Sequence, residues 1–217
     1  MSDIFREVDE EVRREQLKKL WERYGWIAIT LAVLLVAGIG AWRAWQWYEA
    51  KQAAEAGSVF TAAMALSEQG KHEEAEAAFA KLAKDSTASY RMLASFREAA
   101  ELVQRDPKAA VAAYDALSDN RSLGQAMQDL AAVRAGYVLV DTAPYDEIRR
   151  RIEPLTGPDR AFRHSARALL ALAAWRANDD AAMKRWFDMI LGDGETPASI
   201  RSQVEIFNTL KAAEGKS

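Results

Sequence analysis

The sequence predicts an all-α protein, with a single transmembrane helix near the N-terminus followed by an α-solenoid of about four helix hairpins and a capping helix. Its 217 residues contain only 11 Gly and 5 Pro and are rich in Ala, Glu, Arg, Leu and Lys, a composition that favours helix. No residue from Tyr24 to Trp42 is charged. Beyond this stretch, turn signals recur about every 35 residues, which is the spacing of stacked helix hairpins.

The first segment, residues 1–23, is predicted to form an amphipathic helix on the cytoplasmic side. It could dock a cytoplasmic partner or lie against lipid headgroups, and we favour the second alternative. The apolar residues that follow a mostly helical spacing are Phe5, Val8, Val12, Leu17, Leu20 and Tyr24.

The second segment, residues 24–48, is predicted to be a transmembrane helix. Nineteen uncharged residues extend over about 28 Å as a helix, close to the ~30 Å hydrocarbon core of a bilayer. Aromatic residues flank both ends, as in membrane interfaces: Trp21, Tyr24 and Trp26 on one side, and Trp42, Trp45, Trp47 and Tyr48 on the other. The residues expected to form the anchor are Trp26, Ile27, Leu31, Leu34, Leu35, Ile39 and Trp42.

Two alternatives to an anchor stay open at this point, a cleaved signal peptide and a buried helix of a soluble core. A signal peptide usually begins with a short basic region, whereas residues 1–23 contain six Lys or Arg and seven Asp or Glu. Small residues near the end of the apolar stretch, such as Ala37 and Ala41, nevertheless leave cleavage possible.

The distribution of basic residues predicts the orientation of the span. Six Lys or Arg precede the uncharged stretch from Tyr24 to Trp42, whereas only Arg43 and Lys51 follow that stretch closely, so the N-terminus should face the cytoplasm. In a bacterium the remaining residues, 49–217, would be periplasmic. Two pairs of small residues at four-residue spacing, Ala28 with Ala32 and Ala37 with Ala41, could allow another transmembrane helix to approach.

The third segment, residues 49–217, shows a repeating register. The turn signals are EQGKHEE, QRDPKA, DTAPYDE and ANDDAA, and after them Phe79, Tyr114, Ile152 and Phe187 align. Three residues later come Leu82, Leu117, Leu155 and Ile190, and four residues earlier Ala75, Ala110, Ile148 and Met183. The register predicts hairpins over 51–86, 88–120, 122–156 and 160–192, and a capping helix over 197–213 with Ile200, Val204, Phe207 and Leu210 facing inward.

This register resembles the tetratricopeptide repeat, in which a small residue of the first helix packs against the second helix. Sixteen residues before Phe79, Ile152 and Phe187 stand Ala63, Gly136 and Ala171. The second hairpin departs from the pattern because Glu98 occupies that position, and a turn shortened by one residue would bring Ala99 into place.

A solenoid of this kind leaves a concave surface lined by the first helices, where such repeats usually hold peptides. The candidate groove residues on the predicted first helices are Arg91, Arg97, Arg134, Tyr137 and Arg167, with Tyr90 nearby. Arginines there could contact a carboxylate or an extended chain. The alternative is that they are ordinary solvated positions.

Catalysis, cofactor binding and metal binding find no support in the sequence. The chain has no cysteine, no phosphate-binding glycine loop and no nucleophile motif. His72 and His164 stand without other ligands at metal spacing. The net charge of −3 argues against nucleic-acid binding. We therefore expect a protein that is not an enzyme.

The whole arrangement resembles the YfgM-like family of ancillary SecYEG translocon subunits in bacteria. The resemblance rests on the charged segment ending in LKKLWERYGW, the single span and the Ala-rich repeats. It implies a single-pass inner-membrane protein beside the Sec translocon, with a periplasmic chaperone and unfolded exported polypeptides as partners. Two other functions stay open: a structural subunit or assembly factor of another inner-membrane complex, and a scaffold of the cell envelope or of cell division.

Overall fold

The computed structural model describes residues 3–214, with side chains at residues 14, 18–27 and 29–209. The helices in chain order are α1 (Asp3–Glu68), α2 (His72–Asp85), α3 (Ala88–Arg105), α4 (Pro107–Asp119), α5 (Gln125–Leu139), α6 (Tyr145–Ile152), α7 (Arg163–Arg176), α8 (Asp180–Gly192) and α9 (Ala198–Glu214). Two 3₁₀ turns, η1 (Arg121–Leu123) and η2 (Glu153–Leu155), complete the set. Residues 3–214 contain no strand, so the all-α prediction is confirmed.

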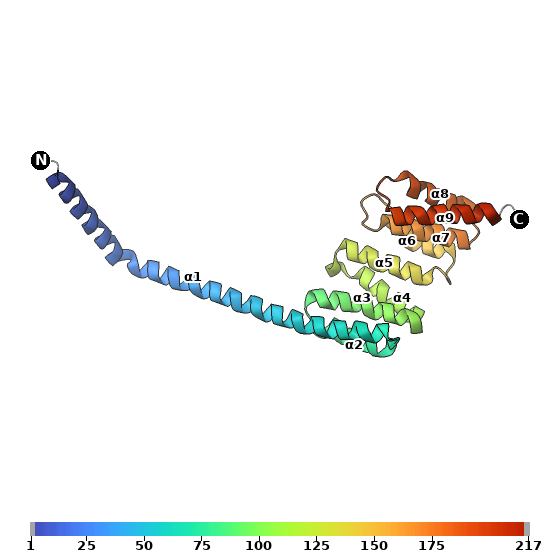
Figure 1. The fold of residues 1–217 in the computed structure, drawn as a ribbon, viewed down its shortest axis with the longest axis horizontal. Helices are drawn as coiled ribbons and strands as arrows, with labels where there is room; N and C mark the ends of the chain where they lie inside the picture. Colours follow the sequence, from blue (N-terminus) through green and yellow to red (C-terminus); the bar gives the residue numbers. More distant parts are fainter. Residues whose placement is uncertain (1–2, 215–217) are drawn as a thin grey trace. The chain divides into compact units, whose positions relative to one another are not determined.

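The first helix, α1, runs without a break through all of the segments predicted before residue 68 (Figure 1). The chain divides into two compact units, Met1–Ala54 and Glu55–Ser217, and α1 contributes to both. The predicted boundaries after residues 23 and 48 therefore stay predictions. The side chains of Phe5, Val8, Val12 and Leu17, expected on one face of the first segment, lie outside the described residues.

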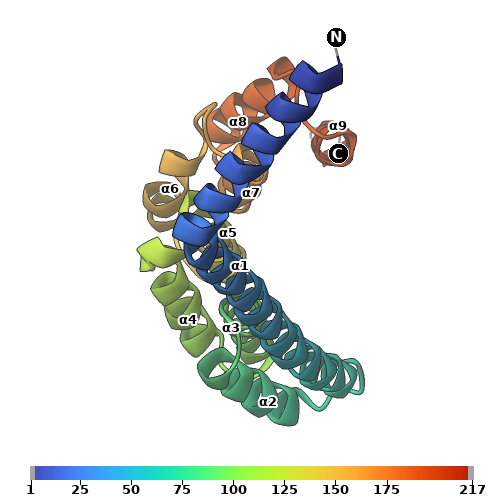
Figure 2. The same ribbon diagram turned by 90° about the vertical axis from the view of Figure 1, so that its left-hand side faces the viewer.

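Within the second unit the helices form consecutive antiparallel pairs (Figure 1). The end of α1 pairs with α2, and the later pairs are α3 with α4, α5 with α6, and α7 with α8. The second helices of these pairs follow the outer side of the stack, whereas α3, α5 and α7 follow its inner side (Figure 2). The four predicted hairpins are confirmed, with helix ends close to the expected positions.

The predicted repeat register also describes the core. Phe79, Tyr114, Ile152 and Phe187 are all buried, and so are the residues four positions before each of them. Three positions later, Leu82, Leu155 and Ile190 are buried, and Leu117 is half-buried. The second helix of each pair therefore presents one apolar stripe to its neighbours, as expected for residues separated by three and four positions along a helix.

The small residues of the first helices, Ala63, Ala99, Gly136 and Ala171, are buried at the seams between helices. In the second pair Ala99 takes the position, as the shortened turn requires: one residue, Asp106, separates α3 from α4, against residues 69–71 between α1 and α2. The Asp106 carboxylate accepts hydrogen bonds from the backbone N–H groups of Lys108 and Ala109 (3.1 and 3.0 Å). This cap starts α4 at once, with Pro107 in its first turn.

The helix α9 covers the end of the stack. Val204 is buried, and Ile200 and Phe207 pack against the core formed by α5 to α8. The rings of Phe207 and Trp175 have their centroids 5.4 Å apart. The predicted capping helix is therefore confirmed, although the side chain of Leu210, also expected to face inward, lies outside the described residues.

We predict that Gly136→Ala destabilises the protein, because an added Cβ would lie 2.6 Å from Cδ2 of Leu169 and 2.8 Å from Cδ1 of Ile152. The expected loss is about 1–3 kcal/mol, as for overpacked cores, and it should outweigh the better helix propensity of alanine. Urea unfolding of the detergent-solubilised full-length protein, followed by circular dichroism, measures it. Gly192→Ala is the matched control, since nothing lies within 4 Å of its added Cβ. Equal stability of both variants would contradict the prediction.

Candidate protein-binding groove

Two arginines occupy equivalent positions on the inner helices of consecutive pairs. Arg97 lies two residues before Ala99 on α3, and Arg134 lies two residues before Gly136 on α5. Both side chains are exposed. Among the described residues, no carboxylate oxygen lies within 4.0 Å of either guanidinium group. Each therefore keeps its hydrogen-bond donors available for a partner outside the chain.

The charges of these arginines act on two neighbouring tyrosines. Burial raises the pKa of the Tyr114 hydroxyl, while the charges of Arg134 and Arg97 act to lower it. Burial likewise raises the pKa of Tyr137, against the opposing charge of Arg134. The positive charges of α3 and α5 thus both act on the Tyr114 hydroxyl. We call Arg97, Arg134 and Tyr137 the inner patch.

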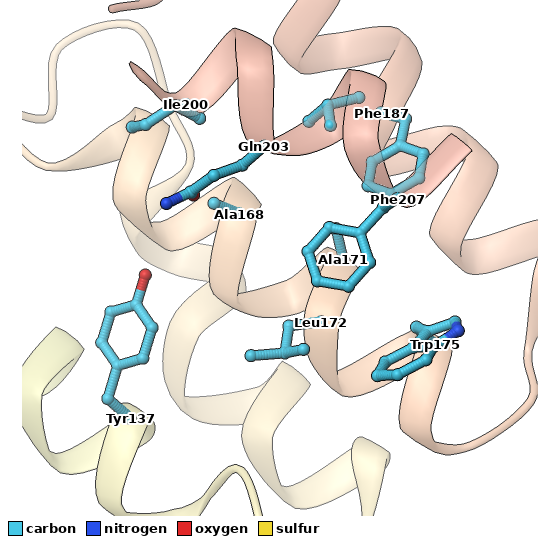
Figure 3. A pocket seen from close by; sticks show the side chains of 10 residues that line it. Tyr137, Ala168, Ala171, Leu172, Trp175, Phe187, Ile200, Gln203 and Phe207 are labelled. Carbon is cyan, nitrogen blue, oxygen red and sulfur yellow. The ribbon is translucent and has the colours of Figure 1, made fainter. Parts of the chain in front are cut away.

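A pocket of about 310 Å³ lies beside Tyr137, between α5, α7 and α9 (Figure 3). Figure 3 shows Tyr137 at one wall, and Trp175 and Phe207 farther along. The lining is mainly apolar, and its polar side-chain atoms belong to Tyr137, Gln203 and the indole of Trp175. The full lining is Tyr137, Ala168, Ala171, Leu172, Trp175, Phe187, Ile200, Gln203, Val204 and Phe207. We call this space the α5–α7–α9 pocket.

The sequence patterns did not single out this pocket, although one signal for it is present. Trp175 follows the small residue Ala171 by four positions, where the other first helices carry Ser67, Val103 and Val140. A large aromatic residue at this one position marks the last pair as different. The contribution of α9 cannot be obtained from the repeat register, because α9 is not part of a hairpin.

Arg91 is exposed but belongs to a different surface from the inner patch. It lines a separate cavity of about 530 Å³ together with residues of α2, α3, α4 and η1. Its neighbour Tyr90 packs against Phe60, with ring centroids 6.0 Å apart, and its hydroxyl lies close to Gly57. Tyr90 therefore has a packing role, and Arg91 is not brought together with Arg97 and Arg134.

The prediction that Arg167 lines the groove is wrong, because its side chain is buried. Its guanidinium group donates to the Thr156 carbonyl (2.9 and 3.2 Å) and to the Asp193 carboxylate (2.8 Å). These bonds join α7 to the end of η2 and to the loop after α8. With its donors engaged inside the domain, Arg167 stabilises the fold and does not face a ligand.

Asp193, which is half-buried, is the centre of this polar cluster. The backbone N–H of Glu195 and the side chains of Arg167 and Arg163 hold the pKa of the Asp193 carboxyl well below its usual range. His164 lies beside the cluster, and burial together with the charge of Arg163 lowers its pKa. The Thr196 hydroxyl lies 3.1 Å from His164 Nδ1 and donates to the Ile190 carbonyl (2.7 Å). The loop that leads into α9 is thereby fixed to α7 and α8.

The apolar part of α1 exposes the residues expected to form the anchor. Trp26, Ile27, Leu31, Leu34, Leu35, Ile39 and Trp42 are all exposed. In the part of the chain that the structure describes, one helical stretch, Lys18–Glu68, is long and apolar enough to cross a membrane. Only 6% of its most apolar window is buried, which disfavours a soluble core helix. Its length and composition suit a membrane anchor or a signal sequence.

Comparison with known proteins identifies the repeat. A family model described as a tetratricopeptide repeat-like domain matches residues 18–182, about three quarters of the chain. The chain belongs to this family. No curated protein and no solved structure matches the sequence. Tetratricopeptide repeat-like domains generally mediate protein–protein interactions and are typically not catalytic. The described residues contain no group of three or more His, Asp or Glu side chains that could hold a metal ion.

We predict that Asp193→Asn destabilises the protein at neutral pH and that this difference shrinks in acid. Because the folded-state pKa of Asp193 is lowered, its stabilising effect is fully present above the unfolded pKa of about 4 and decreases progressively as the pH falls from there toward the folded-state pKa. Urea unfolding of the full-length protein at pH 7 and pH 3 measures this. The control is Asp188→Asn, which removes an exposed pair with Lys184 and should change stability by less than about 1 kcal/mol. A variant difference that stays constant with pH would contradict the prediction.

Proposed function

We propose that this protein is a non-enzymatic, membrane-anchored interaction module that serves as an accessory of the Sec translocon. In this proposal it links the channel to a periplasmic chaperone and receives exported chains. The observation that carries it is the combination, in one tetratricopeptide repeat-like chain, of an exposed apolar helix and an inner patch whose two arginines have no partner within the described residues.

The anchor part of the proposal is supported by exposure and by residue type. Side chains such as Leu34 and Ile39 are exposed over most of their surface, which is costly in water and favourable in lipid. Trp26 and Trp42 stand at the two ends of the uncharged stretch, where aromatic side chains settle in a bilayer. The basic residues before the span support a cytoplasmic N-terminus and a periplasmic repeat domain.

The groove part is supported by the charge and the position of the inner patch. Arg97 and Arg134 lie on neighbouring inner helices, and both can donate two parallel hydrogen bonds to a carboxylate. Tyr137 adds a ring and a hydroxyl one helical turn after Arg134. Such a surface suits an extended polypeptide with acidic residues, since it offers both charge and apolar contact without a cofactor.

Tethering explains how weak binding can serve this role. A groove held by an anchor beside a channel meets each emerging chain at high effective concentration. Contacts between a few exposed arginines and a carboxylate contribute little individually. We therefore propose that the repeat domain binds unfolded segments with micromolar or weaker affinity, and that proximity to the membrane substitutes for affinity.

We predict that the mature protein keeps its apolar helix. In cells it should sediment with membranes, resist extraction by alkaline carbonate, and have an intact mass that includes residues 2–23. These results follow if residues 24–48 span the bilayer. A soluble product that begins near Gly38 to Arg43 would show instead that the helix is a signal sequence.

We predict distinct crosslinking partners for the two parts of the chain. A photoreactive residue replacing Ile39 should capture translocon subunits, because the span is expected to lie beside the channel. The same residue replacing Arg134 should capture nascent exported chains or a chaperone. A probe at Ala112, exposed on the outer helix α4, is the control and should capture neither.

Mass spectrometry of the captured proteins distinguishes the alternatives. Capture from Ile39 of a different membrane complex, with nothing captured from Arg134, would replace the proposal with a structural subunit or an assembly factor. Capture of division or outer-membrane assembly proteins would favour an envelope scaffold. Two small residues, Ala37 and Ala41, share a face of the span, and Ala37→Leu with Ala41→Leu should release a partner that binds through the anchor.

A further inference from the structure

We propose that the α5–α7–α9 pocket holds one aromatic side chain of an extended polypeptide, and that Arg134 pairs with an acidic residue next to that side chain. The inference deepens the proposed function, on which it rests, because it assigns a chemical class of segment to the groove. The occupant is thus a short stretch of partner chain in which Phe, Tyr or Trp neighbours Asp or Glu.

The size and lining of the pocket favour a single side chain. Its volume of about 310 Å³ is at the lower limit of small-molecule pockets, about 300–1,000 Å³. The walls are mostly carbon, from side chains such as Leu172, Trp175 and Phe207. A ring that enters this space leaves water for an apolar surface without burying a charge.

Aromatic residues in the wall make an aromatic occupant better than an aliphatic one. The Phe207 ring lies 5.4 Å from the Trp175 ring and 6.4 Å from the Phe187 ring, measured between centroids, in tilted arrangements. Tilted ring pairs at these distances contribute binding free energy in addition to that gained by burying their apolar surface. An aromatic side chain in the pocket adds such ring contacts, whereas an aliphatic side chain gains only the free energy of apolar burial.

The polar groups of the pocket suit a peptide backbone. The Tyr137 hydroxyl makes no hydrogen bond within the described residues, and Gln203 is exposed on α9. Figure 3 shows the hydroxyl and the amide on the same side of the pocket. A hydroxyl and an amide each donate and accept, as do the N–H and C=O groups of an extended chain.

Charge complementarity selects an acidic neighbour for the aromatic residue. Arg134 lies one turn before Tyr137 on α5, and no carboxylate lies within 4.0 Å of its guanidinium group in the described part of the chain. Arg97, at the equivalent position of α3, adds a second positive charge on the inner side. A basic segment would be repelled by both arginines, whereas an acidic one forms charge-assisted hydrogen bonds.

The pocket depends on a helix outside the repeats. The family model matches residues 18–182, and α9 begins at Ala198. The wall made by Ile200, Gln203 and Phe207 therefore lies outside the matched residues. This location makes the pocket a source of selectivity, because the repeat register alone does not create it.

The test measures binding of fluorescein-labelled peptides to the full-length protein in nanodiscs by anisotropy. The probe is Gly-Ser-Gly-Phe-Asp-Ser-Gly-Ser, and its controls carry Ala in place of Phe or Asn in place of Asp.

Ala168→Leu fills the pocket, because Ala168 lines it. Its matched control is Ala112→Leu on the outer helix α4. Arg134→Gln removes the charge, and its control is Arg121→Gln, an exposed arginine of η1. Thermal unfolding checks that each variant is folded.

The expected result is micromolar binding of the probe and at least a tenfold loss on replacing its Phe with Ala. Ala168→Leu should cause a similar loss, and the two changes together should cause no more than either alone. Arg134→Gln should weaken the Phe-Asp peptide about threefold to tenfold and leave the Phe-Asn peptide unchanged, as in a double-mutant cycle. The two control variants should bind as the wild type does.

Several outcomes would overturn the inference. Binding that is insensitive to Ala168→Leu or to loss of the peptide's Phe shows that the pocket is not occupied. If that binding still requires Arg134, the groove of the proposed function stands while the pocket assignment fails. If none of the peptides binds, the inference is wrong, and crosslinking from Arg134 then decides the proposed function independently.

Discussion

Close approach of helices at one small residue per repeat is the constraint on which the repeat domain depends. Gly136 shows how narrow the seam is, since even a methyl group there would collide with Leu169 and Ile152. The larger buried residues of the second helices pack against rings of neighbouring helices: Phe79 against Phe60 of α1 (5.3 Å between centroids) and Phe187 against Phe207 of α9 (6.4 Å). Tight packing of this kind fixes the position of each hairpin relative to the next.

This packing uses one face of each first helix and leaves the inner side free. Several charges elsewhere in the domain are paired: Arg151 donates to Asp115 (2.8 Å), and Arg105 pairs with Glu76. Arg97 and Arg134 differ in having no such partner among the described residues. Since an exposed ion pair contributes little to folding, a position on the inner side is free to carry charge for binding a partner.

The register made the hairpins predictable, because four aligned segments repeat the same apolar spacing and the same small residue. The single α1 helix was less predictable, although no Gly or Pro stands between Trp42 and Gly57 to end it. The groove was predictable only in part. Arg97, Arg134 and Tyr137 are exposed on inner helices, but the burial of Arg167 depends on Asp193 and on the Thr156 carbonyl, which come from loops that no repeat pattern describes.

The half-buried polar cluster around Asp193 connects the stability of the domain to the shape of the pocket. Arg201 donates to the carbonyl groups of Leu191 and Asp193 (3.0 and 2.9 Å), so the start of α9 is held by the same loop that Arg167 holds. The α9 wall of the pocket is thereby positioned from the interior of the last hairpin. A segment that occupies the pocket binds only the arrangement in which α9 is docked, and by linkage it must stabilise that arrangement. Arg167, which was expected to line the groove, therefore acts from inside the domain, where it helps to position the α9 wall of the pocket.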